Sequence, residues 1–123
     1  MREGITAVVN AQPDMIVIGQ AGDGQEALKQ LRVLRPDVSL LDWNLPVISG
    51  EEVLGTIKAE TPQVRFIVIS ALNDEDCIRH ALSLGANSYL HKDMLRRELL
   101  PAIRAVNGGQ VYIPDTIAKR LKN

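Results

Sequence analysis

Three polar residues of types suited to phosphate chemistry each follow a short apolar run in this sequence. Asp42 closes one run, Ser70 closes a second, and Lys92 follows a third. A carboxylate can attack phosphorus as a nucleophile, a hydroxyl can hydrogen-bond a phosphoryl oxygen, and an ammonium can neutralise the added charge. Taken singly, such residues are more often a turn residue, a strand terminator and a solvated cation. They indicate a site only if the fold brings all three together.

The apolar pattern predicts a sheet that would do so. Short β-branched runs alternate with longer segments of helical spacing, which is typical of a parallel sheet with crossover helices. Four runs are predicted to be strands: residues 15–21, 38–43, 64–71 and 88–91. Their nearly continuous apolar character suits strands that are covered on both faces. We therefore expect an α/β sandwich whose site lies at the carboxyl ends of the strands.

Capping signals place helices between these strands. Asp23 and Ser49 each stand three positions before a glutamate, as in a capping box. Asn73 or Asp74 can cap a third helix, and Gly85 can close that helix in a left-handed conformation.

The last long helix is predicted to begin near Arg97, because Pro101 is tolerated only within about the first turn. Its end is marked by Gly108 and Gly109.

Both ends of the sequence depart from regular alternation. A helix is predicted over residues 3–11, where an alternating fold would place a strand first. After Gly109 the pattern breaks, and residues 116–122 are predicted to form a short amphipathic helix outside the alternating core. We expect residues 1–109 to form the domain and residues 110–123 to be a linker or helix leading toward a further domain.

Composition bounds the remaining possibilities. With 123 residues, 46% of them hydrophobic and 24% charged, the chain has room for one buried core. A net charge of −1 gives no broad basic surface, so direct DNA binding by this segment is not expected. The single cysteine, Cys77, excludes an internal disulfide. No apolar run approaches the ~20 residues that span a bilayer and no signal peptide is evident, which favours a soluble, cytoplasmic protein without a membrane partner.

Taken together, the motifs resemble the receiver domain of two-component response regulators, and more closely the NarL/FixJ class. The resemblance covers nearly all of the chain. It is carried by Arg2–Gly4 at the start of the first helix, Gly22–Ala27, Arg35–Val38 leading to Leu41–Pro46, Ile69–Ala71, Gly85–Asp93 and the tail Ala105–Tyr112. It implies a flavodoxin-like three-layer fold in a regulator of transcription.

The resemblance also implies a role for each candidate residue. Asp42 matches the aspartate that accepts a phosphoryl group from a sensor histidine kinase. Ser70 and Lys92 match the switch hydroxyl and the lysine that contact the phosphoryl group, and Tyr89 matches the switch aromatic whose rotamer follows the hydroxyl. Asn44 matches the position whose backbone carbonyl, together with the carboxylate of Asp42, binds Mg²⁺.

The sequence departs from the family at its start. Receivers begin with a strand that ends in a pair of acidic residues, which hold Mg²⁺, whereas this sequence begins in the following helix. We therefore expect an incomplete metal site and four strands per chain. Three explanations remain open: two strands pair directly, a homodimer completes or rearranges the sheet, or the sequence is a trimmed part of a longer protein.

Two functions are weighed against each other. The first is a signalling module that couples phosphorylation of Asp42 to a dimer or effector surface. The second is a phosphorylation-independent interaction or dimerisation domain, or an inactive fragment. An enzyme with its own substrates is disfavoured, because the sequence has no Gly-rich phosphate loop, HExxH helix or GxSxG elbow.

Overall fold

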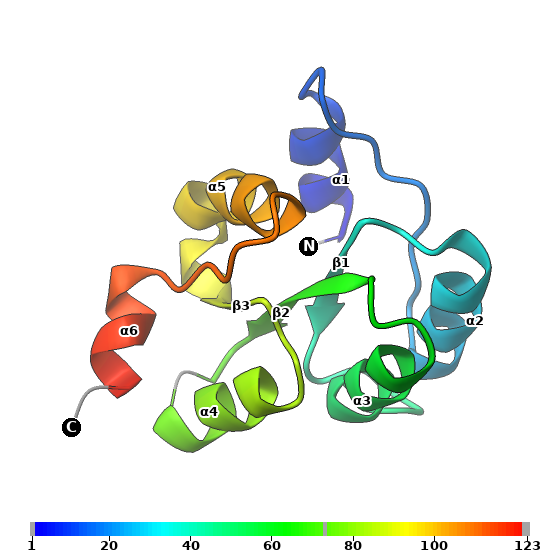
Figure 1. The fold of residues 1–123 in the computed structure, drawn as a ribbon. Coiled ribbons are helices and arrows are strands. Elements are labelled where there is room, and N and C mark those ends of the chain that lie inside the picture. The colour runs from blue at the N-terminus through cyan, green and yellow to red at the C-terminus, as the bar shows by residue number, and fades with distance from the viewer. Residues whose placement is uncertain (1, 73, 122–123) are drawn as a thin grey trace.

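From residue 38 onward, strands and helices alternate along the chain, as the apolar pattern predicts. A computed structural model describes residues 2–72 and 74–121 (Figure 1). The strands are β1 (Val38–Asp42), β2 (Arg65–Ser70) and β3 (Ser88–His91). The helices are α1 (Arg2–Asn10), α2 (Gly24–Leu34), α3 (Gly50–Glu60), α4 (Glu75–Ser83), the 3-10 turn η1 (Lys92–Met94), α5 (Leu95–Asn107) and α6 (Asp115–Leu121).

The strands form one parallel sheet in the order β1-β2-β3. Helices α1 and α5 lie over one face of the sheet, and α2, α3 and α4 lie over the other (Figure 1). Strand β2 is central, and its residues Phe66, Ile67 and Val68 are fully buried. This burial on both faces explains the continuous apolar run and confirms the expected α/β sandwich.

The predicted strand at residues 15–21 is wrong. These residues form no strand in the structure, so the sheet of the described residues has three strands rather than four, and the segment does not pair directly with β1. Ile16 is 77% exposed and Ile18 is 50% exposed. An apolar run indicates that a segment tends to be buried, but a strand also requires a neighbouring strand to hydrogen-bond its backbone N–H and C=O groups. Within the described residues, this segment has no such neighbour.

The predicted caps are confirmed where the structure describes them. The Asp23 carboxylate accepts a hydrogen bond from the Glu26 amide at 2.8 Å, and the Ser49 hydroxyl accepts from the Glu52 amide at 3.2 Å. Asp74 caps α4, while Asn73 lies outside the described residues. Gly85 adopts φ +110°, which is the left-handed conformation expected after α4.

Helix α5 begins earlier than predicted. It starts at Leu95, so Pro101 lies inside the helix beyond its first turn. Proline removes one N–H from the helical ladder, which leaves the Arg97 carbonyl without its usual partner. Pro101 is exposed, so water can reach that carbonyl, while the opposite face of the helix buries Leu99, Ala102 and Val106. Packing of this face outweighs the local cost of the proline.

The predicted C-terminal helix is present as α6, although it lies against the domain. It packs on α4, and its residue Ile117 is 1% exposed. Just before it, Tyr112 forms a parallel bridge with Ser88 in β3, and the Ser88 hydroxyl donates to the Tyr112 carbonyl at 2.6 Å. Lys122, the predicted end of this helix, lies outside the described residues. None of the described helices is both long and apolar enough to cross a membrane.

The stability of the fold should fall at high pH because of Tyr112. Its hydroxyl donates to Glu98 Oε1 at 2.6 Å, and this hydrogen bond, together with burial, raises the pKa of Tyr112 to about 12 from an ordinary value of 10.0. The folded state therefore holds the phenolic proton more tightly than the unfolded state. The resulting stabilisation is full below about pH 10 and is lost as the pH rises toward 12.

Urea unfolding across this pH range measures the effect. The free energy of unfolding should fall more steeply with pH in the wild type than in Tyr112→Phe, which lacks the titrating hydroxyl. Parallel curves for the two proteins would contradict the assignment.

Candidate functional site

The three phosphate-handling residues meet at one edge of the sheet, as the sequence predicts. Asp42 is the last residue of β1, Ser70 is the last residue of β2, and Lys92 directly follows β3. The register pairs Asp42 with Ile69 and Ser70 with His91. Because the strands are parallel, all of these carboxyl ends lie on the same side of the molecule.

Asp42 and Lys92 are in contact. The Lys92 Nζ lies 3.5 Å from Asp42 Oδ2, and the two side chains are 36% and 28% exposed. The other carboxylate oxygen, Oδ1, accepts a hydrogen bond from the Asn44 amide at 3.0 Å. The carboxylate is therefore held in place while part of it stays accessible to a reactant. A cation stands beside it, where negative charge would be added.

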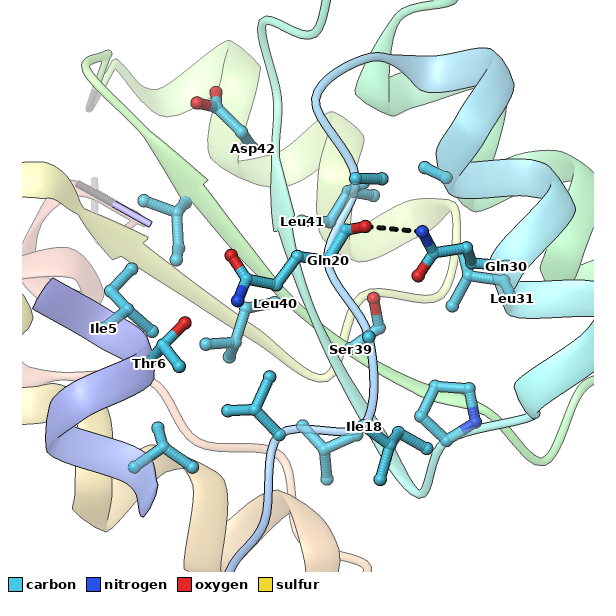
Figure 2. Close-up of a pocket in the computed structure, with 18 of the residues that line it drawn as sticks. Ile5, Thr6, Ile18, Gln20, Gln30, Leu31, Ser39, Leu40, Leu41 and Asp42 are labelled. Carbon is cyan, nitrogen blue, oxygen red and sulfur yellow. Dashed lines mark hydrogen bonds between the residues drawn. The ribbon is translucent and has the colours of Figure 1, made fainter. Parts of the chain in front are cut away.

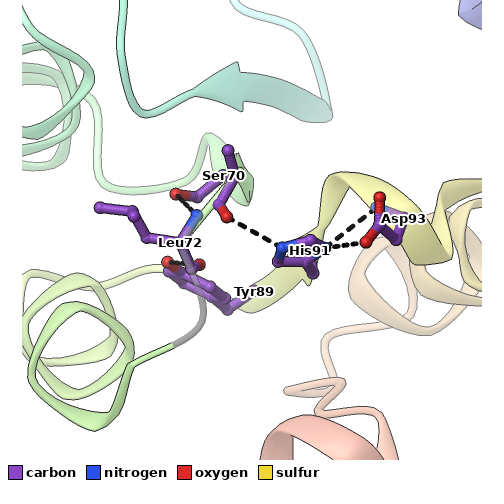
Figure 3. Close-up of polar contacts among 6 residues, drawn as sticks. Ser70, Leu72, Tyr89, His91 and Asp93 are labelled. Carbon is purple, nitrogen blue, oxygen red and sulfur yellow. Dashed lines mark hydrogen bonds and ion pairs between the residues drawn. The ribbon is translucent and has the colours of Figure 1, made fainter.

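Ser70 and Tyr89 form a second group, joined through Leu72 (Figure 3). The Ser70 hydroxyl accepts from the Leu72 amide at 3.0 Å, and the Tyr89 hydroxyl donates to the Leu72 carbonyl at 2.7 Å. Both side chains are fully buried, so Tyr89 already points inward. Burial raises the pKa of Tyr89, and a hydrogen bond with Ser70 acts in the opposite direction.

The two groups are connected through the backbone of the sheet. The Trp43 amide, next to Asp42, donates to the carbonyl of Ile69 at 2.9 Å, and Ile69 precedes Ser70. No direct contact joins the Asp42 carboxylate to the Ser70 hydroxyl among the described interactions.

His91 is a site residue that the sequence interpretation missed. Its Nδ1 accepts from the Asp93 amide at 3.1 Å, so its Nε2 carries the proton and donates to the Ala71 carbonyl at 2.9 Å (Figure 3). The ring thus ties the loop after Ser70 to the turn that carries Lys92. The available signal was a polar residue closing a buried strand immediately before Lys92.

With this geometry in view, the comparison with known families is decisive. Residues 1–104 match the response regulator receiver domain family. The chain belongs to this family.

Curated relatives are named as a transcriptional regulatory protein and as a response regulator. The chain is 35% identical over 121 residues to the uncharacterized transcriptional regulatory protein YxjL of Bacillus subtilis, covering 98% of this chain and 56% of that protein. It is 32% identical over 117 residues to the nitrate/nitrite response regulator protein NarL of Escherichia coli K12, covering 95% of this chain and 54% of that protein. The chain thus spans about half the length of these curated relatives.

Solved receiver structures share the fold. A LuxR-family response regulator from Aurantimonas superposes with a TM-score of 0.92 at 27% identity, covering 98% of this chain and 86% of that one. The receiver domain of a NarL from Mycobacterium tuberculosis superposes with a TM-score of 0.84 at 31% identity, covering 89% of this chain and 88% of that one. The predicted family and its flavodoxin-like fold are confirmed, and the chain is a receiver domain of the NarL/LuxR class of two-component response regulators.

Receiver domains generally bind Mg²⁺ at an acidic pocket. In this receiver the predicted metal-binding residues are Asp42 and the carbonyl of Asn44. The described residues contain no group of three or more His, Cys, Asp or Glu side chains that could hold a metal ion. The Asp42 carboxylate is instead compensated by Lys92. Mg²⁺ in proteins is held in an octahedron of oxygens that includes one or two carboxylates. Among the described residues, the Asp42 carboxylate is therefore paired with an ammonium and belongs to no preformed cluster of metal-ligating side chains.

Proposed function

We propose that this receiver accepts a phosphoryl group on Asp42 from a sensor histidine kinase and transmits the change to a dimer or effector surface. The observation that carries the proposal is the ammonium of Lys92, 3.5 Å from a partly exposed carboxylate at the carboxyl end of a parallel strand. Ser70 ends the neighbouring strand and supplies a hydroxyl at the same edge. Phosphoryl transfer depends mainly on positioning and on neutralising the phosphoryl oxygens, and these residues provide for both.

The transfer forms one bond and breaks one. An oxygen of the Asp42 carboxylate attacks phosphorus in the donor's phosphohistidine, the P–N bond breaks, and its electron pair leaves with the imidazole. The product is an acyl phosphate on Asp42. Lys92 is paired with the carboxylate before the transfer, and it can pair with the phosphoryl oxygens afterwards.

Ser70 and Tyr89 would convert phosphorylation into movement. The Ser70 hydroxyl now contacts Leu72 and Tyr89. Rotation of this hydroxyl toward a phosphoryl oxygen breaks both contacts, so the loop at Leu72 and the ring of Tyr89 must adjust. Phosphorylation then biases a pre-existing equilibrium of the loop before α4. The face formed by α4, β3 and α5 is the surface that would respond, in a homodimer or toward an effector.

Incubation with acetyl phosphate, with and without Mg²⁺, tests the acceptor role. Mass spectrometry should show the gain of one phosphoryl group, and hydroxylamine should remove it, because an acyl phosphate is labile to that nucleophile. The protein unfolded in urea serves as the control and should gain nothing, since the reaction depends on Lys92 beside Asp42. Absence of any gain in both buffers would contradict the proposal.

One observation favours a second candidate function, a phosphorylation-independent interaction domain. The described residues lack an acidic cluster for a metal ion, and the family generally uses that cluster. Under this function, light scattering and partner binding would be the same for the protein before and after acetyl phosphate treatment.

We propose that residues 1–109 form the receiver and that residues 110–123 lead toward an effector domain. The relatives YxjL, named as a transcriptional regulatory protein, and NarL, named as a response regulator, are about twice as long as the region matched, which supports this division. DNA binding would then belong to the other domain.

A further inference from the structure

One peptide group links the Ser70 hydroxyl to the His91 imidazole. The carbonyl of Ala71 and the amide of Leu72 belong to the same peptide group. Its N–H donates to the Ser70 hydroxyl at 3.0 Å, and its C=O accepts from His91 Nε2 at 2.9 Å (Figure 3). A peptide group is planar, so its two ends turn together. Rotation of this peptide therefore has to break both hydrogen bonds.

The position of His91 in β3 explains why its ring reaches this peptide. The register pairs His91 with Ser70, so the imidazole lies level with the end of β2. Its Nδ1 accepts from the Asp93 amide at 3.1 Å, which leaves Nε2 as the donor of the ring. The His91 side chain is only 17% exposed. The donor therefore has a fixed direction and is largely shielded from water that would compete for it.

A second side chain of β3 binds the next carbonyl. Tyr89 stands two residues before His91, so both side chains leave the same face of the strand. The Tyr89 hydroxyl donates to the Leu72 carbonyl at 2.7 Å, while His91 donates to the Ala71 carbonyl. Of these two donors, His91 is the one bound to the peptide that also contacts Ser70.

The contact of Ser70 with this peptide competes with a contact to a phosphoryl group on Asp42. Figure 2 shows the Asp42 carboxylate at the end of β1, beyond Leu40 and Leu41. The Ser70 hydroxyl is turned instead to the Leu72 amide. Rotation of the hydroxyl toward a phosphoryl oxygen leaves that amide without its partner, which is costly for as long as the peptide stays fixed. An interaction that fixes the peptide therefore favours the unphosphorylated arrangement.

We propose that His91 is a positioning residue that fixes the Ala71–Leu72 peptide in this arrangement and thereby controls how readily Ser70 turns toward Asp42. A hydrogen bond to the carbonyl polarises the peptide and strengthens the bond made by its N–H. Loss of the Nε2 donor therefore loosens both ends of the peptide. This role rests on the proposed function of Asp42 and adds a residue that controls the response of Ser70.

Two substitutions separate the two hydrogen bonds of the ring. In His91→Gln, the carboxamide nitrogen is as many bonds from Cβ as Nε2 is, so it can donate to the Ala71 carbonyl. In His91→Asn, the carboxamide oxygen is as many bonds from Cβ as Nδ1 is, so it can accept from the Asp93 amide. The asparagine side chain is too short to reach Ala71. Only His91→Gln therefore retains the contact on which the proposal depends.

Amide hydrogen exchange of the unphosphorylated protein, followed by NMR, is the first measurement. His91→Asn should speed exchange of the Leu72 amide by about two- to tenfold, as expected for the loss of one hydrogen bond. His91→Gln should restore the wild-type rate. The Trp43 amide, which donates to Ile69, is the internal reference and should be unchanged. Equal Leu72 exchange in the two variants, or an equal rise at Trp43, would overturn the proposal.

The rate of phosphorylation by acetyl phosphate is the second measurement. His91→Asn should gain a phosphoryl group about two- to tenfold faster than His91→Gln, because Ser70 leaves its partner at a lower cost. Equal rates, or a slower rate in His91→Asn, would overturn the proposed control of Ser70.

The two measurements also separate this proposal from the proposed function. If Leu72 exchange responds as expected but even the wild type gains no phosphoryl group, the acceptor role of Asp42 is contradicted and the positioning of the peptide by His91 is supported. If the wild type is phosphorylated and the two variants agree in both measurements, the proposed function stands and the role of His91 is overturned.

The wild-type ring decides the matter if His91→Asn fails to fold. Nitrogen-15 NMR of the imidazole should show the proton on Nε2, with slow exchange against water. A proton on Nδ1, or rapid exchange at Nε2, would overturn the proposal, because the Ala71 carbonyl would then have no fixed donor from His91.

Discussion

Asp42→Asn should reduce phosphorylation by acetyl phosphate to background. The amide has no anionic oxygen to attack phosphorus and cannot form the acyl phosphate. The fold should be unaffected, because the asparagine carbonyl can still accept from the Asn44 amide. Loss of the partly exposed ion pair with Lys92 should cost at most ~1 kcal/mol. The measurement is the phosphorylated fraction by mass spectrometry, with the unfolding midpoint recorded for each protein.

Asp37→Asn is the matched control. Asp37 is an exposed aspartate at the opposite end of β1, and its backbone carbonyl, which bonds to Arg65, is unchanged by the substitution. This variant should be phosphorylated to the same extent as the wild type. If phosphorylation persists in Asp42→Asn and falls in Asp37→Asn, the acceptor lies at the amino end of β1. That outcome would contradict the proposal.

Gly24→Ala should destabilise the protein, although helix propensity alone predicts the opposite. Gly24 is the first residue of α2, and its amide donates to the Pro46 carbonyl at 2.9 Å. A Cβ at this position would lie 1.8 Å from the backbone carbonyl oxygen of Ile48. Backbone must move to relieve this clash, and overpacking of this kind costs ~1–3 kcal/mol or more. Urea unfolding should show a lower midpoint.

Gly55→Ala is the control with the opposite expected sign. Gly55 lies within α3, and no atom is found within 4 Å of the position a Cβ would take. Alanine in the interior of a helix is more stable than glycine by roughly 0.5–1 kcal/mol, so this variant should unfold at higher urea concentration. If both variants shift the urea unfolding midpoint in the same direction, the close approach of the Ile48 carbonyl does not explain the change in stability at Gly24.

The local elements were predictable because their signals lie within a few residues of each other. Asp23 and Ser49 cap helices through amides three positions away, and Gly85 closes α4 by its own backbone freedom. Strand β2 is surrounded on both sides and both faces, so its composition alone identifies it. Asp42, Ser70 and Lys92 follow from the same reasoning, since parallel strands place their carboxyl ends together.

Other features depend on contacts between residues far apart in the chain, which no local sequence pattern indicates. Residues 15–21 have the composition of a strand, yet their backbone has no neighbouring strand in the described structure. Pro101 was predicted to limit the start of α5, but burial of the opposite helix face decided that boundary. The role of His91 rests on the Ala71 carbonyl, a residue twenty positions away.

The sequence by itself determined the parallel α/β fold, the family and the edge of the sheet where Asp42 and Lys92 lie. These depend on apolar periodicity and short-range capping, which are encoded in consecutive residues. Only the tertiary structure decided that the described residues form a sheet of three strands and that Tyr89 is already inward. Strand pairing, burial and cavities arise between segments far apart in the chain, so no local pattern specifies them.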